Sequence, residues 1–99
     1  MKKIVVTGGE GRFASFLKKI KTTHTLIFPK KNELDITNYL MVKKYLKKSK
    51  ANIVIHLAAL SRPMTLHETN IQLSIKLNII GTANIVRACA DKNIKLIYF

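Results

Sequence analysis

Three small residues at one strand-to-helix junction have the spacing that binding of a dinucleotide needs. Gly8, Gly11 and Ala14 lie three residues apart, directly after the β-branched run at 3–7. In such a site the first glycine makes a tight turn, the second lets a pyrophosphate approach the backbone, and the third lets helix and strand pack closely. The alternative is that the glycines only make a turn. We predict a phosphate site here, with Arg12 either at a phosphate or in solvent.

The end of the second predicted strand is where two dinucleotides are told apart. An Asp or Glu at this point bonds the ribose 2′-hydroxyl of NAD, whereas a cation accepts the 2′-phosphate of NADP. The sequence has Phe28, Pro29, Lys30 and Lys31 here, with no acid among them. We therefore favour NADP over NAD as the cofactor, with Lys30 or Lys31 as the phosphate partner.

Short β-branched runs predict the strands that position these residues. They lie at 3–7, 25–28 and 95–99, and the stretch 51–59 is a third strand with an exit of small residues. Such continuous apolar runs are typical of strands buried on both faces.

Helical spacing of apolar residues predicts the segments between the strands. One helix carries Phe13, Phe16, Leu17 and Ile20 on its apolar side, and a second starts after an N-cap at Thr37 or Asn38. A long helix at about 70–91 is apolar on more than one face, which predicts burial on two sides. The alternation predicts an α/β fold, a Rossmann-type parallel sheet in the order 3-2-1-4 with flanking helices, truncated after the fourth strand.

The charge of the chain raises a rival interpretation. Its 99 residues include 18 Lys and Arg against 5 Asp and Glu, a net charge of +13. Most of the cations fall on the outer sides of the two amphipathic helices, and no aromatic residues interleave with them as a nucleic-acid stacking platform requires. We interpret the excess as solvated lysine faces and expect no nucleic-acid partner.

Other classes of protein are not expected. No apolar run approaches the roughly 18 to 20 residues of a membrane helix, and the glycines come too early for a signal peptide, so we expect a cytoplasmic protein without a membrane partner. The single Cys89 excludes a disulfide framework. The histidines His24, His56 and His67 share no metal-ligand spacing, so no metal is expected.

Four segments, in chain order, resemble the extended short-chain dehydrogenase/reductase superfamily, the NAD-dependent epimerase/dehydratase group. They are Thr7–Ala14, Leu34–Thr37, Val54–Ala59 and Asn78–Asn84. The sugar-nucleotide branch is the most similar, and the stretch Glu33–Asn38 most resembles dTDP-4-dehydrorhamnose reductases. Residues 1–99 correspond to the N-terminal part of an NAD(P)-binding Rossmann domain in those longer enzymes.

The resemblance implies roles for particular residues. Gly8, Gly11 and Arg12 would hold the pyrophosphate, and Asp35 with Ile36 would frame the adenine, although Asp35 has the alternative of capping the following helix. Ala58, Ala59 and Leu60 would line the way to the nicotinamide ribose, or the two alanines are small because a helix packs there. The expected cofactor-binding set is Gly8, Gly11, Arg12, Phe13, Lys30, Lys31, Asp35, Ile36, Ala58, Ala59 and Leu60.

The resemblance also implies hydride transfer with a Tyr acid/base, a Lys four residues later and a Ser or Thr on the carbonyl oxygen. Tyr39 and Lys43 have that spacing but lie in the helix between the second and third strands, so we assign them no catalysis. The family's catalytic residues would follow Phe99, and Asn78 either supports a proton relay or is a satisfied core amide.

We therefore expect the cofactor-binding portion of an NAD(P)-dependent oxidoreductase that reduces a nucleotide-linked 4-keto sugar. The alternatives are a sugar-nucleotide epimerase or dehydratase, and an inactive nucleotide-binding remnant. The chain alone is expected to be inactive. It is also expected to self-associate through the bare edge of the fourth strand.

Overall fold

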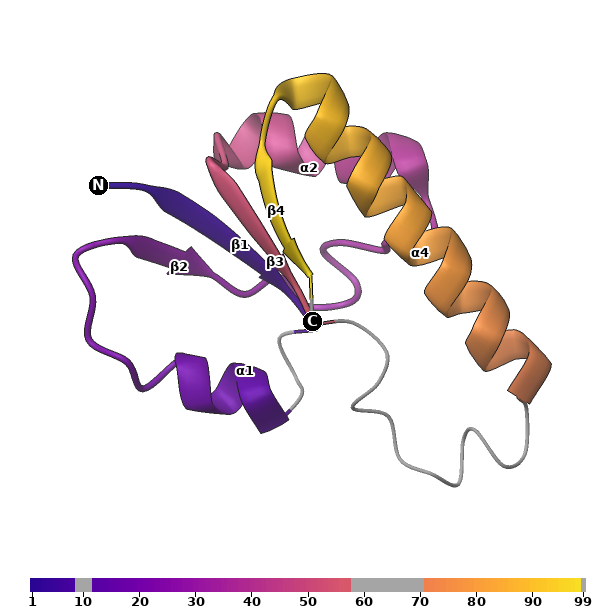
Figure 1. The fold of residues 1–99 in the computed structure, drawn as a ribbon, viewed down its shortest axis with the longest axis horizontal. Helices are drawn as coiled ribbons and strands as arrows, with labels where there is room; N and C mark the ends of the chain where they lie inside the picture. The colour runs from indigo at the N-terminus through magenta and orange to yellow at the C-terminus, as the bar shows by residue number, and fades with distance from the viewer. Residues whose placement is uncertain (9–11, 58–70, 99) are drawn as a thin grey trace.

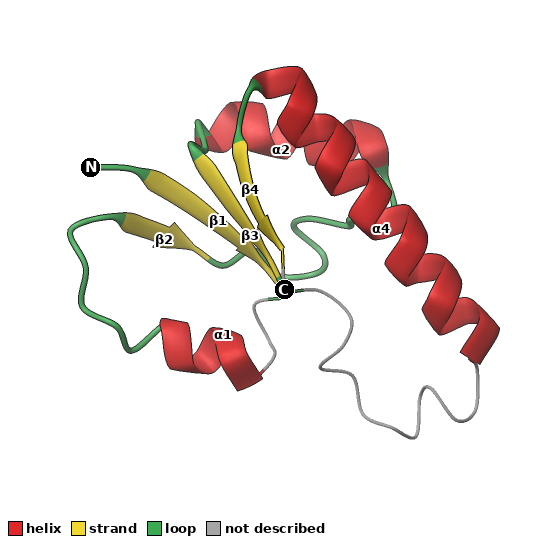
Figure 2. Ribbon diagram, viewed as in Figure 1, coloured by secondary structure: helices red, strands yellow, loops and turns green. Residues whose placement is uncertain are grey.

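The computed structural model describes residues 1–8, 12–57 and 71–98, in which strands and helices alternate (Figures 1 and 2). The elements are β1 (Lys3–Thr7), α1 (Arg12–Leu17), β2 (Thr25–Ile27), α2 (Tyr39–Ser49), β3 (Ile53–His56), α4 (Ile71–Lys92) and β4 (Lys95–Tyr98). All neighbouring strands pair in parallel, and Figure 1 shows α2 and α4 together on one side of the sheet with α1 apart from them. The α/β fold with a parallel, Rossmann-type sheet is confirmed.

The strand order within this sheet is 2-1-3-4 and not the predicted 3-2-1-4. β3 pairs with β1, with Val54 opposite Val5 and His56 opposite Thr7, and β2 is left at the edge. The physical reason is that β2 has only three residues, all partly buried, whereas β3 has four, of which Val54 and His56 are buried. The more buried β3 therefore lies inside the sheet between β1 and β4, and the short β2 lies at its edge.

The main core lies between the sheet and the helices α2 and α4. It unites buried apolar side chains from the sheet, from α2 and α4 and from the segments on either side of α2: Val5, Leu34, Val42, Leu46, Ala51, Val54, Ile85, Ala88 and Cys89. Val6 and Ala14 are also fully buried but lie outside this cluster. Since neighbouring residues of a strand face opposite sides, Val6 belongs to the face of α1.

Helix α1 is shorter than predicted. It ends at Leu17, where the N–H groups of Lys19 and Ile20 turn to carbonyls three residues back, which tightens and stops the helix. Phe16 is 66% and Ile20 46% exposed, so the predicted apolar side of this helix is not buried in the described chain. Only Ala14 is fully buried among the described side chains of α1.

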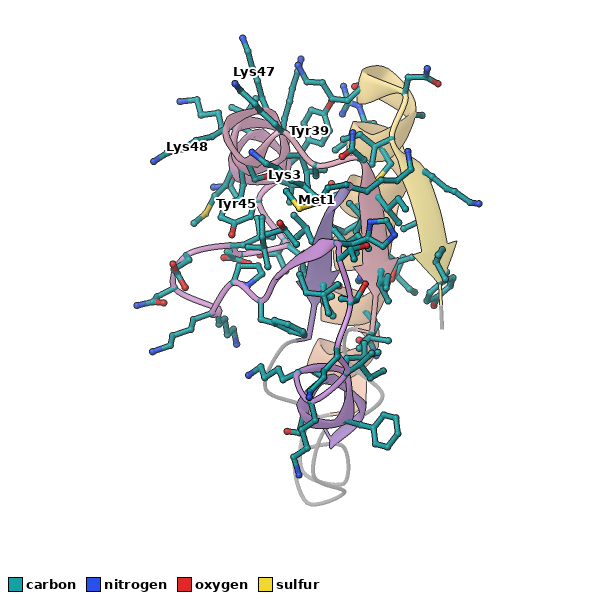
Figure 3. All side chains as sticks on the ribbon, turned by 90° about the vertical axis from the view of Figure 1, so that its left-hand side faces the viewer. Met1, Lys3, Tyr39, Tyr45, Lys47 and Lys48 are labelled. Atoms are coloured by element: carbon teal, nitrogen blue, oxygen red, sulfur yellow. The ribbon has the colours of Figure 1, made fainter. Side chains whose placement is uncertain are left out.

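Helix α2 has caps at both ends. The side chain of Asn38 accepts from the backbone N–H of Met41, which confirms the N-cap prediction for Asn38 over Thr37. At the other end Lys50 has φ 56° and ψ 41°, and its backbone N–H returns to the last turn of the helix. Lys47 and Lys48 point away from the body of the molecule, as Figure 3 shows, which agrees with a solvated lysine face.

Helix α4 is buried on one side along the part whose side chains are described. Ile85, Ala88 and Cys89 are buried, whereas Ile79 is 64% and Val86 47% exposed. The predicted burial on two sides is wrong for these residues, because among the described elements the sheet and α2 lie against the same side of the helix. No helix within the described residues is long and apolar enough to cross a membrane.

Candidate functional site

The candidate site lies at the carboxyl edge of the sheet, where β1 and β3 end side by side. Thr7 and His56 are opposite each other in register, and the chain leaves β1 toward α1 and β3 toward α4. Figure 1 shows α1 and α4 on opposite sides of the sheet. An edge at which successive connections leave to opposite faces is a topological switch point, the usual ligand crevice of open α/β sheets.

Gly8 makes the turn directly after β1. Its φ of 77° lies in the left-handed region that side chains avoid, so glycine is needed here for the backbone conformation. Arg12 and Phe13 begin α1. Gly11, Ala58, Ala59 and Leu60 lie outside the described residues, so their predicted roles stay predictions.

A chain of side-chain contacts joins the ends of β1 and β3 to helix α4. The hydroxyl Oγ1 of Thr7 lies 2.6 Å from Nδ1 of His56, and Nε2 of His56 lies 2.9 Å from Oγ1 of Thr82. A neutral imidazole has one N–H and one acceptor nitrogen, so one threonine hydroxyl donates to the ring and the other accepts from it. Both ring nitrogens of His56 are thus partnered across three elements.

Burial keeps this imidazole uncharged. His56 is 1% exposed, and its desolvation lowers the pKa to about 4, well below the usual value of 6.5. The sequence prediction considered His56 only as a metal ligand and missed its contacts with Thr7 and Thr82. The signal available in the sequence was its place at the end of a predicted strand, whereas the tertiary structure decided that this strand lies beside β1, with His56 opposite Thr7.

The segment between β2 and α2 holds Asp35 in a local turn. Oδ1 of Asp35 accepts from the backbone N–H of Thr37 at 3.0 Å and from its hydroxyl at 2.6 Å. These bonds lower the pKa of the carboxyl group, chiefly through the hydroxyl, so it is ionised at neutral pH. Asn38, and not Asp35, is the N-cap of α2, so the capping alternative for Asp35 is wrong.

Ile36 is held by helix α4. Its backbone carbonyl accepts from Nδ2 of Asn84 at 2.9 Å, and its side chain packs where Gly81 leaves room. Asn78 is partly buried on the same helix, one turn before Thr82. The sequence segment 78–84 therefore contacts both His56, at the end of β3, and Ile36, in the segment between β2 and α2.

Lysines gather at the end of β2. Lys30 and Lys31 are exposed. The backbone around them is fixed, because the side chain of Glu33 accepts from the N–H of Lys30 at 2.9 Å and the N–H of Leu34 donates to the carbonyl of Lys30. The ammonium of Lys18 lies 5.2 Å from the centre of the Phe28 ring, which brings a third cation to this point. Sequence reasoning missed Lys18, since only the return of the chain after α1 places it here.

Tyr39 and Lys43 do not form a catalytic pair. The hydroxyl of Tyr39 donates to Asp91, and the guanidinium of Arg87 lies over its ring at 4.0 Å. The hydrogen bond to Asp91 raises the pKa of Tyr39, the opposite of what a catalytic tyrosine needs. Both of its partners belong to α4, so Tyr39 joins α2 to α4. In the described part of the chain, no group of three or more potential ligands could hold a metal ion.

Comparisons with known proteins agree with this geometry. The family described as RmlD substrate binding domain matches residues 1–99. The chain is 32% identical over 97 residues to the GDP-6-deoxy-D-talose 4-dehydrogenase of Aggregatibacter actinomycetemcomitans, covering 93% of this chain and 32% of that protein. It therefore spans about a third of the length of the curated relative that it matches.

Two solved structures have the same fold over nearly the whole chain. The dTDP-4-dehydrorhamnose reductase of Bacillus anthracis in complex with NADP has a TM-score of 0.86 and 26% identity, and the match covers 99% of this chain and 36% of that one. The dTDP-4-dehydrorhamnose reductase of Clostridium acetobutylicum has a TM-score of 0.80 and 30% identity, over 95% and 34%. Because the family model matches all of residues 1–99, the chain belongs to the RmlD substrate binding domain family.

Proposed function

We propose that residues 1–99 form the cofactor-binding portion of an NADP(H)-dependent reductase that acts on a nucleotide-linked 4-keto sugar. The observation that carries the proposal is the switch point between β1 and β3. There Gly8, with its positive φ, directly follows a buried parallel strand, at the edge where open α/β sheets bind dinucleotides.

The residues at this edge fit a dinucleotide. Gly8 removes the side chain that would crowd a phosphate, and Lys30 and Lys31 offer exposed cations at the end of the neighbouring strand β2. Asp35 and Ile36 follow in a segment with fixed backbone. Gly11, Arg12, Phe13, Ala58, Ala59 and Leu60 complete the proposed set, on the resemblance alone. When bound, the cofactor would supply a hydride to the carbonyl carbon of the sugar.

We place the 2′-phosphate of NADP at the cations after β2. A phosphate is recognised there by charge, and three lysines, Lys18, Lys30 and Lys31, lie at this point, where the charge of Lys31 also helps to lower the pKa of the Asp35 carboxyl group. The NADP in the B. anthracis relative supports the same choice. NAD(H) is the alternative cofactor.

Titration of the full-length protein with NADPH and NADH tests the cofactor. We expect NADPH to bind at least tenfold more tightly, the effect of about 1.4 kcal/mol from one well-placed charge pair. Lys30→Glu should remove most of that preference, with Lys44→Glu on the outer face of α2 as the charge-matched control. Tighter binding of NADH, or an unchanged preference in Lys30→Glu, would contradict the assignment.

The names of the relatives support this substrate class. Their names contain both dTDP-linked and GDP-linked sugars, so the nucleotide is tested directly. NADPH oxidation by the full-length protein is followed with a dTDP-linked and a GDP-linked 4-keto-6-deoxy sugar. We expect turnover of one of them, with the hydride added to the carbonyl carbon and a proton to its oxygen. Conversion without net NADPH oxidation favours an epimerase or dehydratase, and binding without conversion favours a nucleotide-binding remnant.

A further inference from the structure

One turn of α4 lies so close to Ile36 that any side chain at position 81 would force Ile36 to shift. A Cβ atom placed on Gly81 would lie 2.5 Å from Cδ1 and 2.7 Å from Cγ1 of Ile36. Carbon atoms attract each other only at separations of about 3.5 to 4.0 Å, so both positions would be strongly repulsive. The Ile36 side chain therefore rests against the bare backbone of the helix.

The same turn also holds the main chain of Ile36. Nδ2 of Asn84 donates to the Ile36 carbonyl oxygen at 2.9 Å, across 48 positions of sequence. Directly before it, Asp35 closes a turn through both the N–H and the hydroxyl of Thr37. Residues 35–37 are thus fixed internally by Asp35 and externally by α4.

This segment follows the strand next to the glycine turn. β2 pairs with β1, and both end at the carboxyl edge of the sheet. In an open α/β sheet the strand beside the phosphate-binding turn carries the residues that meet the adenosine ribose. Since the Ile36 side chain faces α4, its backbone and Asp35 are what remain for the nucleotide.

We propose that Gly81 and Asn84 are positioning residues for the adenosine half of the cofactor site, acting through Ile36. The inference rests on the proposed function. Neither residue needs to touch the cofactor, because Gly81 sets how near the segment lies to α4 and Asn84 sets the direction of its carbonyl group.

The probe is adenosine 2′,5′-bisphosphate, which carries the adenosine half of NADP without the nicotinamide. It is titrated calorimetrically into the full-length protein and into Gly81→Ala and Asn84→Ala. We expect each change to raise the Kd at least fivefold, about the effect of losing one hydrogen bond. Ala83→Ser is the matched control, because Ala83 lies between the two residues on the exposed side of the helix and should leave the Kd unchanged.

Two further variants distinguish positioning of the adenosine site from a general loss of stability. Val54→Ala cuts into the same core from β3, so a Kd raised as much as in Gly81→Ala would overturn the proposal. The double variant Gly81→Ala/Ile36→Ala keeps only the Ile36 Cβ, 3.5 Å from the new methyl group. It should regain the wild-type Kd within about twofold, since 3.5 Å is an ordinary contact, and a Kd as high as that of Gly81→Ala would contradict the steric argument.

Binding to the wild-type protein separates a failure of the proposed function from a failure of the positioning role. If it binds neither NADPH nor the bisphosphate, the proposed function fails and the positioning role fails with it. If it binds both, and Gly81→Ala and Asn84→Ala bind the bisphosphate as tightly as the wild type, only the positioning role is overturned.

Discussion

Nδ1 of His56 lies 2.6 Å from the hydroxyl oxygen of Thr7, although the two residues are 49 positions apart in the sequence. The contact joins the last residues of β1 and β3, directly beside the Gly8 turn. Through its other nitrogen the same ring reaches Thr82 of α4. A buried, neutral imidazole with both nitrogens partnered thus ties together the elements that meet at the candidate site.

Stability should fall on mild acidification because of His56. Its pKa is about 4 in the folded protein and about 6.5 in the unfolded chain, so between these values only the unfolded chain binds the proton. The free energy of unfolding should therefore decrease as the pH falls from about 6.5 to about 4, by about 3 kcal/mol. Urea unfolding at a series of pH values measures this slope.

The variant His56→Asn should flatten that slope while keeping a polar side chain. His24→Gln, which removes an exposed imidazole, is the control. The lowered pKa of Asp35 adds a loss of stability only near and below its usual value of 3.8, outside most of the histidine window. An unchanged slope in His56→Asn would show that another group is responsible.

Removing the hydroxyl of Thr82 should destabilise the fold. Thr82→Val keeps the shape of the side chain but leaves Nε2 of the buried His56 without this partner, at a cost of about 1–3 kcal/mol in unfolding free energy. Thr82→Ser retains the hydroxyl and should lose less. Denaturant unfolding compares the two, and equal stabilities would mean that the hydrogen bond contributes nothing.

Replacing Lys50 with glycine should stabilise the protein. It is a left-handed residue at the end of α2, with φ 56°, a conformation that glycine adopts without strain. Lys50→Gly is expected to raise the unfolding free energy by about 0.5–1 kcal/mol, seen as a higher urea midpoint at unchanged m-value. Asn93→Gly is the comparison, because asparagine tolerates its φ of 57° and less is to be gained. A lower midpoint for Lys50→Gly would contradict the strain argument.

Cys89 should be nearly inert toward thiol reagents in the native protein. It is 2% exposed, and burial raises its pKa to about 11, so little thiolate is present at neutral pH. Labelling by an aromatic disulfide reagent should be at least about a hundredfold slower than in urea, from the thiolate fraction alone. Cys89→Ala gives the background, and rapid native labelling would show that this part of the core opens.

Local features of the chain were predictable from the sequence. They include the strands at the β-branched runs, the turn at Gly8 and the N-cap at Asn38. Each follows from the preferences of single residues and their neighbours, which act over a few positions. Tyr39 could be separated from catalysis because it lies in the helix between the second and third strands.

Tertiary structure decided everything that depends on which segments meet. The strand order 2-1-3-4 follows from the length and burial of competing strands, and the exposure of Phe16 depends on which segments lie against α1. The partners of His56 and the need for glycine at 81 arise from contacts between residues far apart in the sequence. A local pattern records how a segment folds, but not which distant backbone will lie against it.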